Sequence, residues 1–233
     1  MGLRLDLPYL VSKKGHVLSP RPIGVKKLKI PKRVFFMLGY PGTGKSTAIA
    51  SILEKLRKNH PRLRVQGFYQ KPLLRRGENI GVESVSVNGP SKIFTSTYPI
   101  PWSATRTPPF LGKHRIDIGA FESIALPELK LHYETELFVV DEVGVKELMS
   151  PKFYPLLQDV LNSEVPILGA LQRNCYWEDE IKQVEEIKKR KDTLIYKIYK
   201  KTTNHTAKLV YQRLNQFFLY RKEEGRDHIR RSH

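Results

Sequence analysis

Apolar residues along this chain gather in short runs that alternate with charged, helix-like segments. Val34 to Leu38 is a continuous apolar run of strand length. Apolar residues then recur at 48, 49, 52, 53 and 56, which is the spacing of one helix face. Alternating strands and helices predict an α/β fold with a mostly parallel sheet, whose ligands bind at the carboxyl ends of the strands.

The same criteria place the other elements. Strands are expected at 63–70, 136–142, 165–171 and 193–199, and helices at 121–131, 151–161, 177–191 and 206–221. Ser150 is expected to cap the helix that starts at Pro151. Two β-rich runs, 82–87 and 91–96, flank Asn88-Gly89, which is a strong signal of a β-hairpin. The stretch 98–109 is rich in proline, lacks periodicity and is expected to be an irregular loop.

A complete phosphate-binding motif joins the first strand to the first helix. The motif G-x-x-x-x-G-K-[ST] is formed by Gly39, Tyr40, Pro41, Gly42, Thr43, Gly44, Lys45 and Ser46, and Thr47 follows it. Glycines let backbone N–H groups turn toward phosphate oxygens, and the following helix directs its positive end at the same anion. Lys45 is expected to contact the β- and γ-phosphates, and the Ser46 hydroxyl to ligate Mg²⁺. A turn without a ligand would have no use for this Lys-Ser pair, so residues 39–47 are predicted to bind a nucleotide.

A second buried strand ends in two acids, Asp141 and Glu142. Asp141 is expected to hold Mg²⁺ directly or through water, and Glu142 to activate the water that attacks the γ-phosphate. Because side chains alternate along a strand, the two carboxylates are expected on different sides and in different roles. The inserted hairpin is expected over the nucleotide cleft.

Positive charge is concentrated at the two ends of the chain, which has 233 residues and a net charge of +18. Residues 1–33 carry +8 and residues 182–233 carry +9, whereas residues 34–181 carry +1. The ends could therefore bind RNA or another polyanion without sequence preference, or be solvated flanks with no partner. We expect a basic extension at 1–32, a nucleotide-binding domain at 33–221 and a basic tail at 222–233.

Cysteine usage and hydropathy indicate the compartment. Cys175 is the single cysteine of the chain, so no intrachain disulfide can form. No apolar run approaches the roughly 18 residues of a membrane span. These features predict an intracellular, cytoplasmic protein. A mitochondrial or nuclear location stays open, although prolines at positions 8, 20 and 22 interrupt any long amphipathic leader helix.

These motifs together resemble one family, the P-loop nucleoside-triphosphatases of thermophiles and the cancer-related nucleoside-triphosphatase. The resemblance covers about residues 33–200 and depends on residues 39–47, Gly67-Phe68-Tyr69, Gly112-Lys113 with Phe121-Glu122, and Asp141-Glu142-Val-Gly144 with Glu147-Leu148-Met-Ser150 and Phe153. It implies a RecA-like three-layer α/β fold and slow, Mg²⁺-dependent hydrolysis of several nucleoside triphosphates, such as ATP and GTP, to diphosphate and phosphate. It also implies the same roles for Lys45, Ser46, Asp141 and Glu142.

The chain departs from this family at several charged positions. Pro72, Leu74 and Asn79 stand where the family has acids and arginines, and no arginine follows the last strand, where Thr203 lies. Val145 replaces the lysine after Asp-Glu-x-Gly. Cationic candidates for stabilising the transferred phosphoryl group are Arg75, Arg76, Lys113 and Arg115.

Two other functions stay open at this stage. A nucleotide or small-molecule kinase would use the same P-loop, with the hairpin and the proline-rich loop forming an acceptor site. A nucleotide-regulated, RNA-associated protein would depend on its basic ends.

Overall fold

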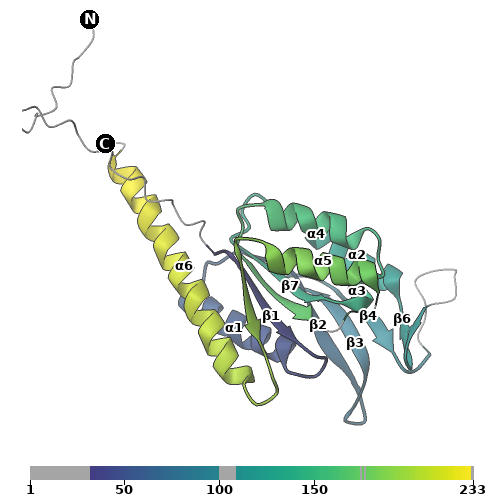
Figure 1. The fold of residues 1–233 in the computed structure, drawn as a ribbon. Helices are drawn as coiled ribbons and strands as arrows, with labels where there is room; N and C mark the ends of the chain where they lie inside the picture. The colour runs from purple at the N-terminus through teal and green to yellow at the C-terminus, as the bar shows by residue number, and fades with distance from the viewer. Residues whose placement is uncertain (1–31, 100–108, 174, 176, 232–233) are drawn as a thin grey trace, which may run out of the picture. The chain divides into compact units, whose positions relative to one another are not determined.

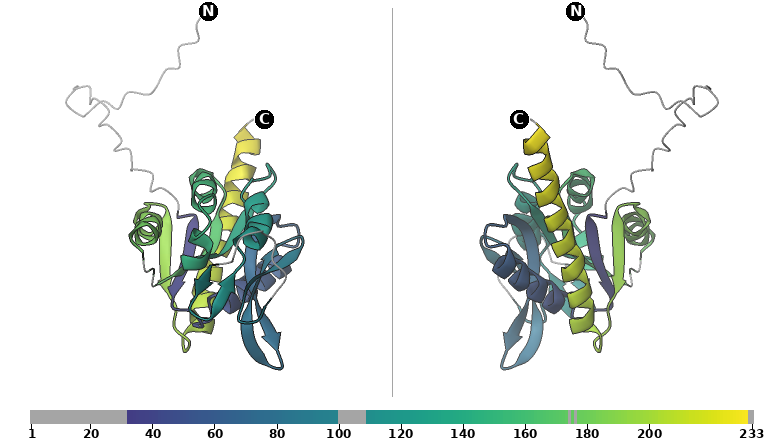
Figure 2. Two further views of the ribbon diagram at one scale, coloured as in Figure 1. Left: turned by 90° about the vertical axis from the view of Figure 1, so that its right-hand side faces the viewer. Right: turned by 90° about the vertical axis from the view of Figure 1, so that its left-hand side faces the viewer.

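A computed structural model of the chain describes residues 32–99, 109–173, 175 and 177–231 (Figure 1). Within these residues, nine strands form one mixed sheet in the order β5-β6-β4-β3-β2-β7-β8-β1-β9. Helices cover both faces of this sheet, as the two end-on views in Figure 2 show. The predicted three-layer α/β fold is therefore confirmed. Most of the loop expected at 98–109, and all but the last residue of the extension expected at 1–32, lie outside the described residues.

Five strands on one side of the sheet run parallel. They are β2 (Val65–Arg75), β7 (Leu137–Val143), β8 (Ile167–Gln172), β1 (Val34–Gly39) and β9 (Thr193–Lys197). Strand β8 separates β1, which ends in the glycine loop, from β7, which ends in the two acids. All five carboxyl ends therefore meet at one edge, where the motif residues were expected to gather.

Four antiparallel strands extend the sheet beyond β2. They are β3 (Glu78–Ser86), β4 (Ser91–Ser96), β5 (Phe110–Leu111) and β6 (His114–Ile116). The hairpin at Asn88-Gly89 is present, between β3 and β4. However, β2 does not end at residue 70 as expected: it continues to Arg75 and turns back at Arg76-Gly77, where φ is 52° and 82°. The insertion is thus larger than one hairpin; it continues the sheet, and its strands form part of the wall of the pocket beside the glycine loop.

The helices divide between the two faces of the sheet. One face carries α1 (Lys45–Asn59) and α6 (Thr203–Arg231). The other carries α2 (Ile118–Glu128), α3 (Val145–Leu148), α4 (Phe153–Asn162) and α5 (Glu178–Lys189). In β1, Phe35 packs toward the first face and Phe36 toward the second. Burial on both faces explains why this strand is apolar at every position.

Three predicted helix boundaries are wrong. The helix expected at 121–131 is α2, which begins earlier because the Asp117 side chain accepts a hydrogen bond from the backbone N–H of Ala120 at 2.9 Å. Ser150 does not cap α4; its hydroxyl donates to Glu122 Oε1 at 2.8 Å, and α4 begins at Phe153. The last helix runs from Thr203 to Arg231, past the expected ends. No helix in the described part of the chain is long and apolar enough to cross a bilayer.

Candidate nucleotide-binding site

The glycine loop lies between the end of β1 and the start of α1, as expected. Gly42 and Gly44 adopt left-handed conformations, with φ of 75° and 92°. A Cβ atom at Gly44 would also lie 2.8 Å from the Thr203 hydroxyl oxygen. Both the left-handed backbone and this close approach therefore favour glycine at position 44. The first turn of α1 contains no acidic residue, and no side chain caps it. The positive end of the helix is therefore available to an anion.

Lys45 is buried at the centre of this loop. Its Nζ donates to the carbonyl oxygens of Gly39 and Tyr40, each at 3.0 Å, and lies 3.0 Å from Glu142 Oε2. The glycine loop and the acidic end of β7, about 100 residues apart in the chain, thus meet through this ion pair. Its side chains are nearly buried, with 5% of Lys45 and 11% of Glu142 exposed. An ammonium in this position can exchange these partners for phosphate oxygens with a small movement of its end.

Asp141 lies beside the same loop. Its carboxylate is 1% exposed, interacts with the Ser46 hydroxyl, and has one oxygen 3.5 Å from the backbone nitrogen of Gln70. Burial, followed by the nearby Glu142 charge, raises the pKa of Asp141 to about 6. The two acids were expected on different sides of β7, yet both face the loop. The pairing of β7 with β8 shifts between Val140 and Val143, so simple alternation does not hold there.

Behind the two acids lies a polar group that the sequence did not reveal. Gln70 Nε2 donates to Glu147 Oε1, and Lys146 Nζ donates to Gln70 Oε1 at 3.0 Å. Burial raises the pKa of Glu147 to about 7, and the nearby Lys146 charge opposes that rise. Lys146 is adjacent in sequence to Val145, where the family lysine is missing. One indication of this group was present in the sequence: the polar residue Gln70 stands at the end of the predicted strand 63–70.

A pocket of about 610 Å³ runs from the glycine loop to the antiparallel strands. Its near wall includes Lys45, Ser46 and Glu142, and its far wall comes from β3, β4 and the β5–β6 turn. Of the predicted cations, Lys113 lines the pocket. Arg115 instead lies over the Phe110 ring, at 5.4 Å from its centroid.

The other two predicted cations lie at the tip of the β2–β3 hairpin. The Arg75 guanidinium lies over the Tyr98 ring, at 4.4 Å from its centroid, and Arg76 forms the turn. Neither residue belongs to the pocket wall.

Thr203, at the start of α6, supports the glycine loop from behind. Its hydroxyl donates to the carbonyl oxygen of Thr43 at 3.0 Å. Nearby, the Arg173 guanidinium lies 5.0 Å from the centroid of the exposed Tyr40 ring. Through these contacts, the start of the last helix and the residue after β8 both pack against the loop. Thr203 thus has a structural role at a place where the sequence has no arginine.

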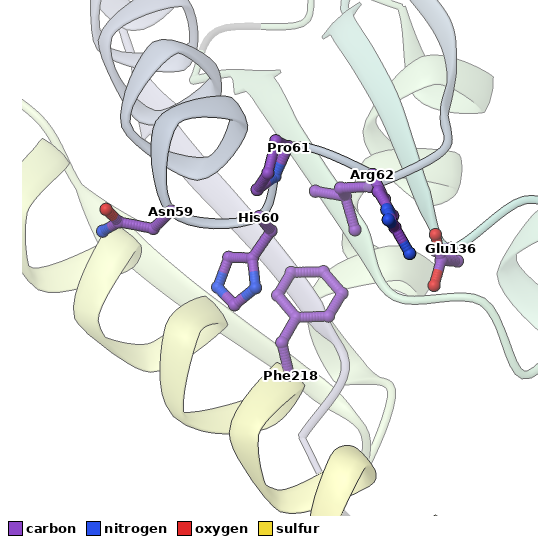
Figure 3. A pocket seen from close by; sticks show the side chains of 7 residues that line it. Asn59, His60, Pro61, Arg62, Glu136 and Phe218 are labelled. Atoms are coloured by element: carbon purple, nitrogen blue, oxygen red, sulfur yellow. The ribbon is translucent and has the colours of Figure 1, made fainter.

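A second hollow, of about 380 Å³, lies at the other edge of the sheet (Figure 3). It is formed by the end of α1, the following loop, the start of β7 and α6. The rings of His60 and Phe218 meet there with centroids 5.5 Å apart, and Glu136 lies across the opening. This edge carries the amino ends of the parallel strands, away from the phosphate-binding loop, so we do not place the active site there.

A glycine loop at a strand–helix junction, with a buried lysine that faces two carboxylates of another strand, defines a P-loop nucleotide-binding protein. The sequence model of the family described as NTPase matches residues 34–211. The nucleoside-triphosphatase THEP1 of Korarchaeum cryptofilum is 35% identical over 162 residues, which are 68% of this chain and 74% of that protein. The human cancer-related nucleoside-triphosphatase is 29% identical over 184 residues, covering 74% and 92%.

Solved structures agree with this assignment. The solution structure of the human cancer-related nucleoside-triphosphatase superposes with a TM-score of 0.63, at 26% identity, and covers 79% of this chain and 98% of that one. The crystal structure of THEP1 from Aquifex aeolicus has the same fold, with a TM-score of 0.61 and coverage of 76% and 96%. The chain belongs to the NTPase family and is a nucleoside-triphosphatase, as its motifs predicted.

Proposed function

We propose that this enzyme hydrolyses several nucleoside 5′-triphosphates to diphosphate and phosphate in a Mg²⁺-dependent reaction at the glycine loop. The observation that carries this proposal is the 3.0 Å contact between Lys45 Nζ and Glu142 Oε2. It joins the residue that would bind phosphate to the residue that would activate water.

Lys45 would change partners when the triphosphate binds. Its present partners are two loop carbonyls and Glu142. Phosphate oxygens carry more negative charge than carbonyls, and the loop N–H groups and the α1 terminus would hold them in line with the ammonium. This exchange would release the Glu142 carboxylate from its ion pair, so substrate binding itself would prepare the base.

Glu142 would then take a proton from water as the water oxygen attacks the γ-phosphorus. The bond between that phosphorus and the bridging oxygen breaks, and the diphosphate leaves with the electron pair. Lys45 would stabilise the charge on the transferred group.

The side chains beside the loop suit Mg²⁺. The ion prefers oxygen ligands and is commonly held by one or two carboxylates together with substrate phosphates. Asp141 and Ser46 supply a carboxylate and a hydroxyl in contact with each other, and the raised pKa of Asp141 reflects a buried carboxylate with too little positive charge beside it. When bound, Mg²⁺ would neutralise charge on the β- and γ-phosphates.

Broad base specificity is proposed because Pro72, Leu74 and Asn79 stand where the family has acids and arginines, and no arginine directly follows the last strand. Thr203 lies where the family has an arginine, and its hydroxyl donates a hydrogen bond to the backbone of the glycine loop. A base held mainly through phosphates would be poorly discriminated, since discrimination requires specific hydrogen-bond partners.

Phosphoryl transfer to an acceptor other than water is a second candidate. The observation that favours it is the length of the pocket, which continues from Glu142 to the antiparallel strands. Water activation by Glu142 is preferred because the carboxylate lies directly at the phosphate-binding lysine.

One assay separates these candidates. Phosphate release is measured for ATP, GTP, CTP and UTP, with Mg²⁺ and with chelator, and phosphoryl transfer from γ-labelled ATP to candidate acceptors is measured in parallel. Hydrolysis of all four that stops in chelator supports the proposal. Transfer that exceeds release with one acceptor would replace it with a kinase function.

A nonspecific association with RNA through the basic ends is a separate proposal. It rests on the charges of +8 over residues 1–33 and +9 over residues 182–233.

A further inference from the structure

The far end of the pocket is separated from the phosphate-binding loop by several strands. Thr95 on β4 lies three strands from Glu142 on β7, which is about 14 Å at the usual strand spacing. The γ-phosphate is expected beside Lys45 and Glu142, because these residues line the end of the pocket nearest the glycine loop. With the γ-phosphate in that position, the far end would lie on the side of Glu142, the proposed base, three strands further along the sheet.

Hydrogen-bond donors and positive charge face this far end. Lys113 is exposed in the turn between β5 and β6, and the structure gives it no ion pair among the described residues. His114, next to it, has a buried Nδ1 without a hydrogen-bond partner in the described part of the chain. The Asn79 side chain uses its oxygen on the backbone of Gly81, which leaves its amide group as a donor. The wall thus presents an ammonium and an amide group as donors, beside an imidazole whose Nδ1 can donate or accept according to its tautomer.

Lys146 lies between the two ends of the pocket. Its ammonium contacts Gln70 at 3.0 Å and lies 5.7 Å from the centroid of the Phe94 ring on β4. Burial, with the charges of Lys113 and Lys146, lowers the pKa of His114. Both lysines therefore lie near His114. Lys146 is also ion-paired with Glu147, with Nζ 3.8 Å from Oε1, whereas Lys113 has no ion pair among the described residues. Glu142, the acid in the pocket wall, pairs with Lys45.

The geometry points to a second anion-binding site at this end of the pocket, formed by Asn79, Lys113 and His114, with Lys146 at its inner side. We infer that its ligand is a phosphate group on the Glu142 side of the bound nucleotide. Two sources share this chemistry: the phosphate released by hydrolysis, and the phosphate of a second small molecule. The inference rests on the proposed function only in placing a triphosphate at the loop.

The test follows the imidazole C–H signals of the full-length protein by NMR, with His114→Gln identifying the relevant one among seven histidines. Inorganic phosphate and glycerol 2-phosphate are titrated, with glycerol as the neutral control. The loop is either filled by Mg²⁺ with the non-hydrolysable β,γ-imido analogue of ATP, filled by Mg²⁺-ADP, or disabled by Lys45→Ala. Lys113→Ala is compared with Lys92→Ala, an exposed lysine of β4 outside the pocket wall.

A separate site predicts that phosphate shifts the His114 signal saturably in the filled wild type and in Lys45→Ala. Lys113→Ala should weaken this binding about tenfold, the effect of losing one charge-assisted hydrogen bond, and Lys92→Ala should not. Glycerol 2-phosphate binding to the complex with the imido analogue would assign the site to a second molecule. Phosphate binding to the Mg²⁺-ADP complex and to Lys45→Ala, without glycerol 2-phosphate binding to the complex with the imido analogue, would assign the site to the released phosphate.

Two results overturn the inference. Phosphate that is displaced by the imido analogue and fails to bind Lys45→Ala occupies the loop, and there is no second site. Equal affinity in Lys113→Ala and Lys92→Ala would mean that the far wall does not contact the anion. Neither result depends on turnover: if Lys45→Ala hydrolyses nucleotide normally, the proposed function fails while the His114 titration still reports on the second site.

Discussion

Lys45 Nζ and Glu142 Oε2 lie 3.0 Å apart beneath the phosphate-binding loop. Without nucleotide, the ammonium and the carboxylate neutralise each other in a buried place, where either charge alone would be costly. In the proposed mechanism, a bound triphosphate would compete with Glu142 for Lys45. Glu142 would then stay paired until substrate arrives, and this coupling has consequences for each residue of the site.

Replacing Lys45 tests the phosphate-binding assignment. Lys45→Ala is expected to abolish detectable hydrolysis and to weaken triphosphate binding by about 10- to 100-fold, because hydrogen bonds from a charged donor are lost. Lys55→Ala, an exposed lysine of the same helix, is the matched control and should behave as wild type. Turnover and nucleotide affinity are measured together, with circular dichroism to verify the fold. Normal turnover in Lys45→Ala would remove the loop from the mechanism.

The raised pKa of Asp141 predicts a pH-dependent stability difference. The folded pKa, about 6, lies above the ordinary value of 3.8, so this group favours folding when protonated and that contribution is lost as the pH rises from about 4 through 6. Asp141→Asn removes the ionisation penalty, which is on the order of 3 kcal/mol at one pKa unit per 1.4 kcal/mol. The metal-free variant should thus melt several degrees above wild type at pH 8, and the gap should shrink toward pH 5.

Thermal melts of the metal-free proteins check this prediction. Asp159→Asn, at an exposed position of α4, is the matched control and should show no pH-dependent gap. A gap of the same size at pH 5 and pH 8 would mean that Asp141 is not ionising in this range. Added Mg²⁺ and nucleotide should stabilise wild type and have much less effect on Asp141→Asn, since the variant lacks the carboxylate.

Base specificity and rate form another prediction. If the enzyme holds the nucleotide mainly through its phosphates, kcat/KM for ATP, GTP, CTP and UTP should agree within about tenfold. We also expect a kcat at or below about 1 s⁻¹, which is the low end for ordinary enzymes. Steady-state phosphate release with each nucleotide measures both quantities. A strong preference for one base, with much faster turnover, would show that other side chains replace the missing arginines.

The basic ends should bind polyanions independently of catalysis. Filter binding to RNA is expected to weaken steeply with salt, because each neutralised phosphate releases condensed counterion. Deleting residues 1–32 and the part after Arg221 should weaken this binding and leave hydrolysis unchanged. The shortened α6 keeps the buried residues Ala207, Val210, Leu214 and Phe218, which precede the cut and pack on the core. Equal RNA affinity in both proteins would identify the ends as solvated flanks.

The strands and the two motifs could be predicted because each depends on local sequence. The apolar run of β1 and the loop chemistry at residues 39–47 are complete within a few residues, and the acids follow β7 directly. The hairpin at Asn88-Gly89 is also local, since those residue types favour the turn.

The rest depends on contacts between distant segments. The hairpin at Arg76-Gly77 requires Arg76 to adopt a left-handed conformation, which is uncommon for residues other than glycine. Pro72 also weakens the strand pattern of β2, although it pairs with Val82 in the sheet. The link from Lys146 through Gln70 to Glu147 joins residues about 76 positions apart, so no spacing rule reveals it.

The most direct test of the proposed mechanism is Glu142→Gln, which removes the proposed base and frees Lys45 from its ion pair. A neutral amide cannot take the proton from water, so hydrolysis should fall by about 10²–10⁴. Mg²⁺-ATP binding should be kept or become tighter, because Lys45 no longer pairs with a carboxylate. Phosphate release and equilibrium binding of the imido analogue are measured on the same protein. Loss of hydrolysis with retained binding is the predicted result; turnover at the wild-type rate would contradict the account and place water activation elsewhere.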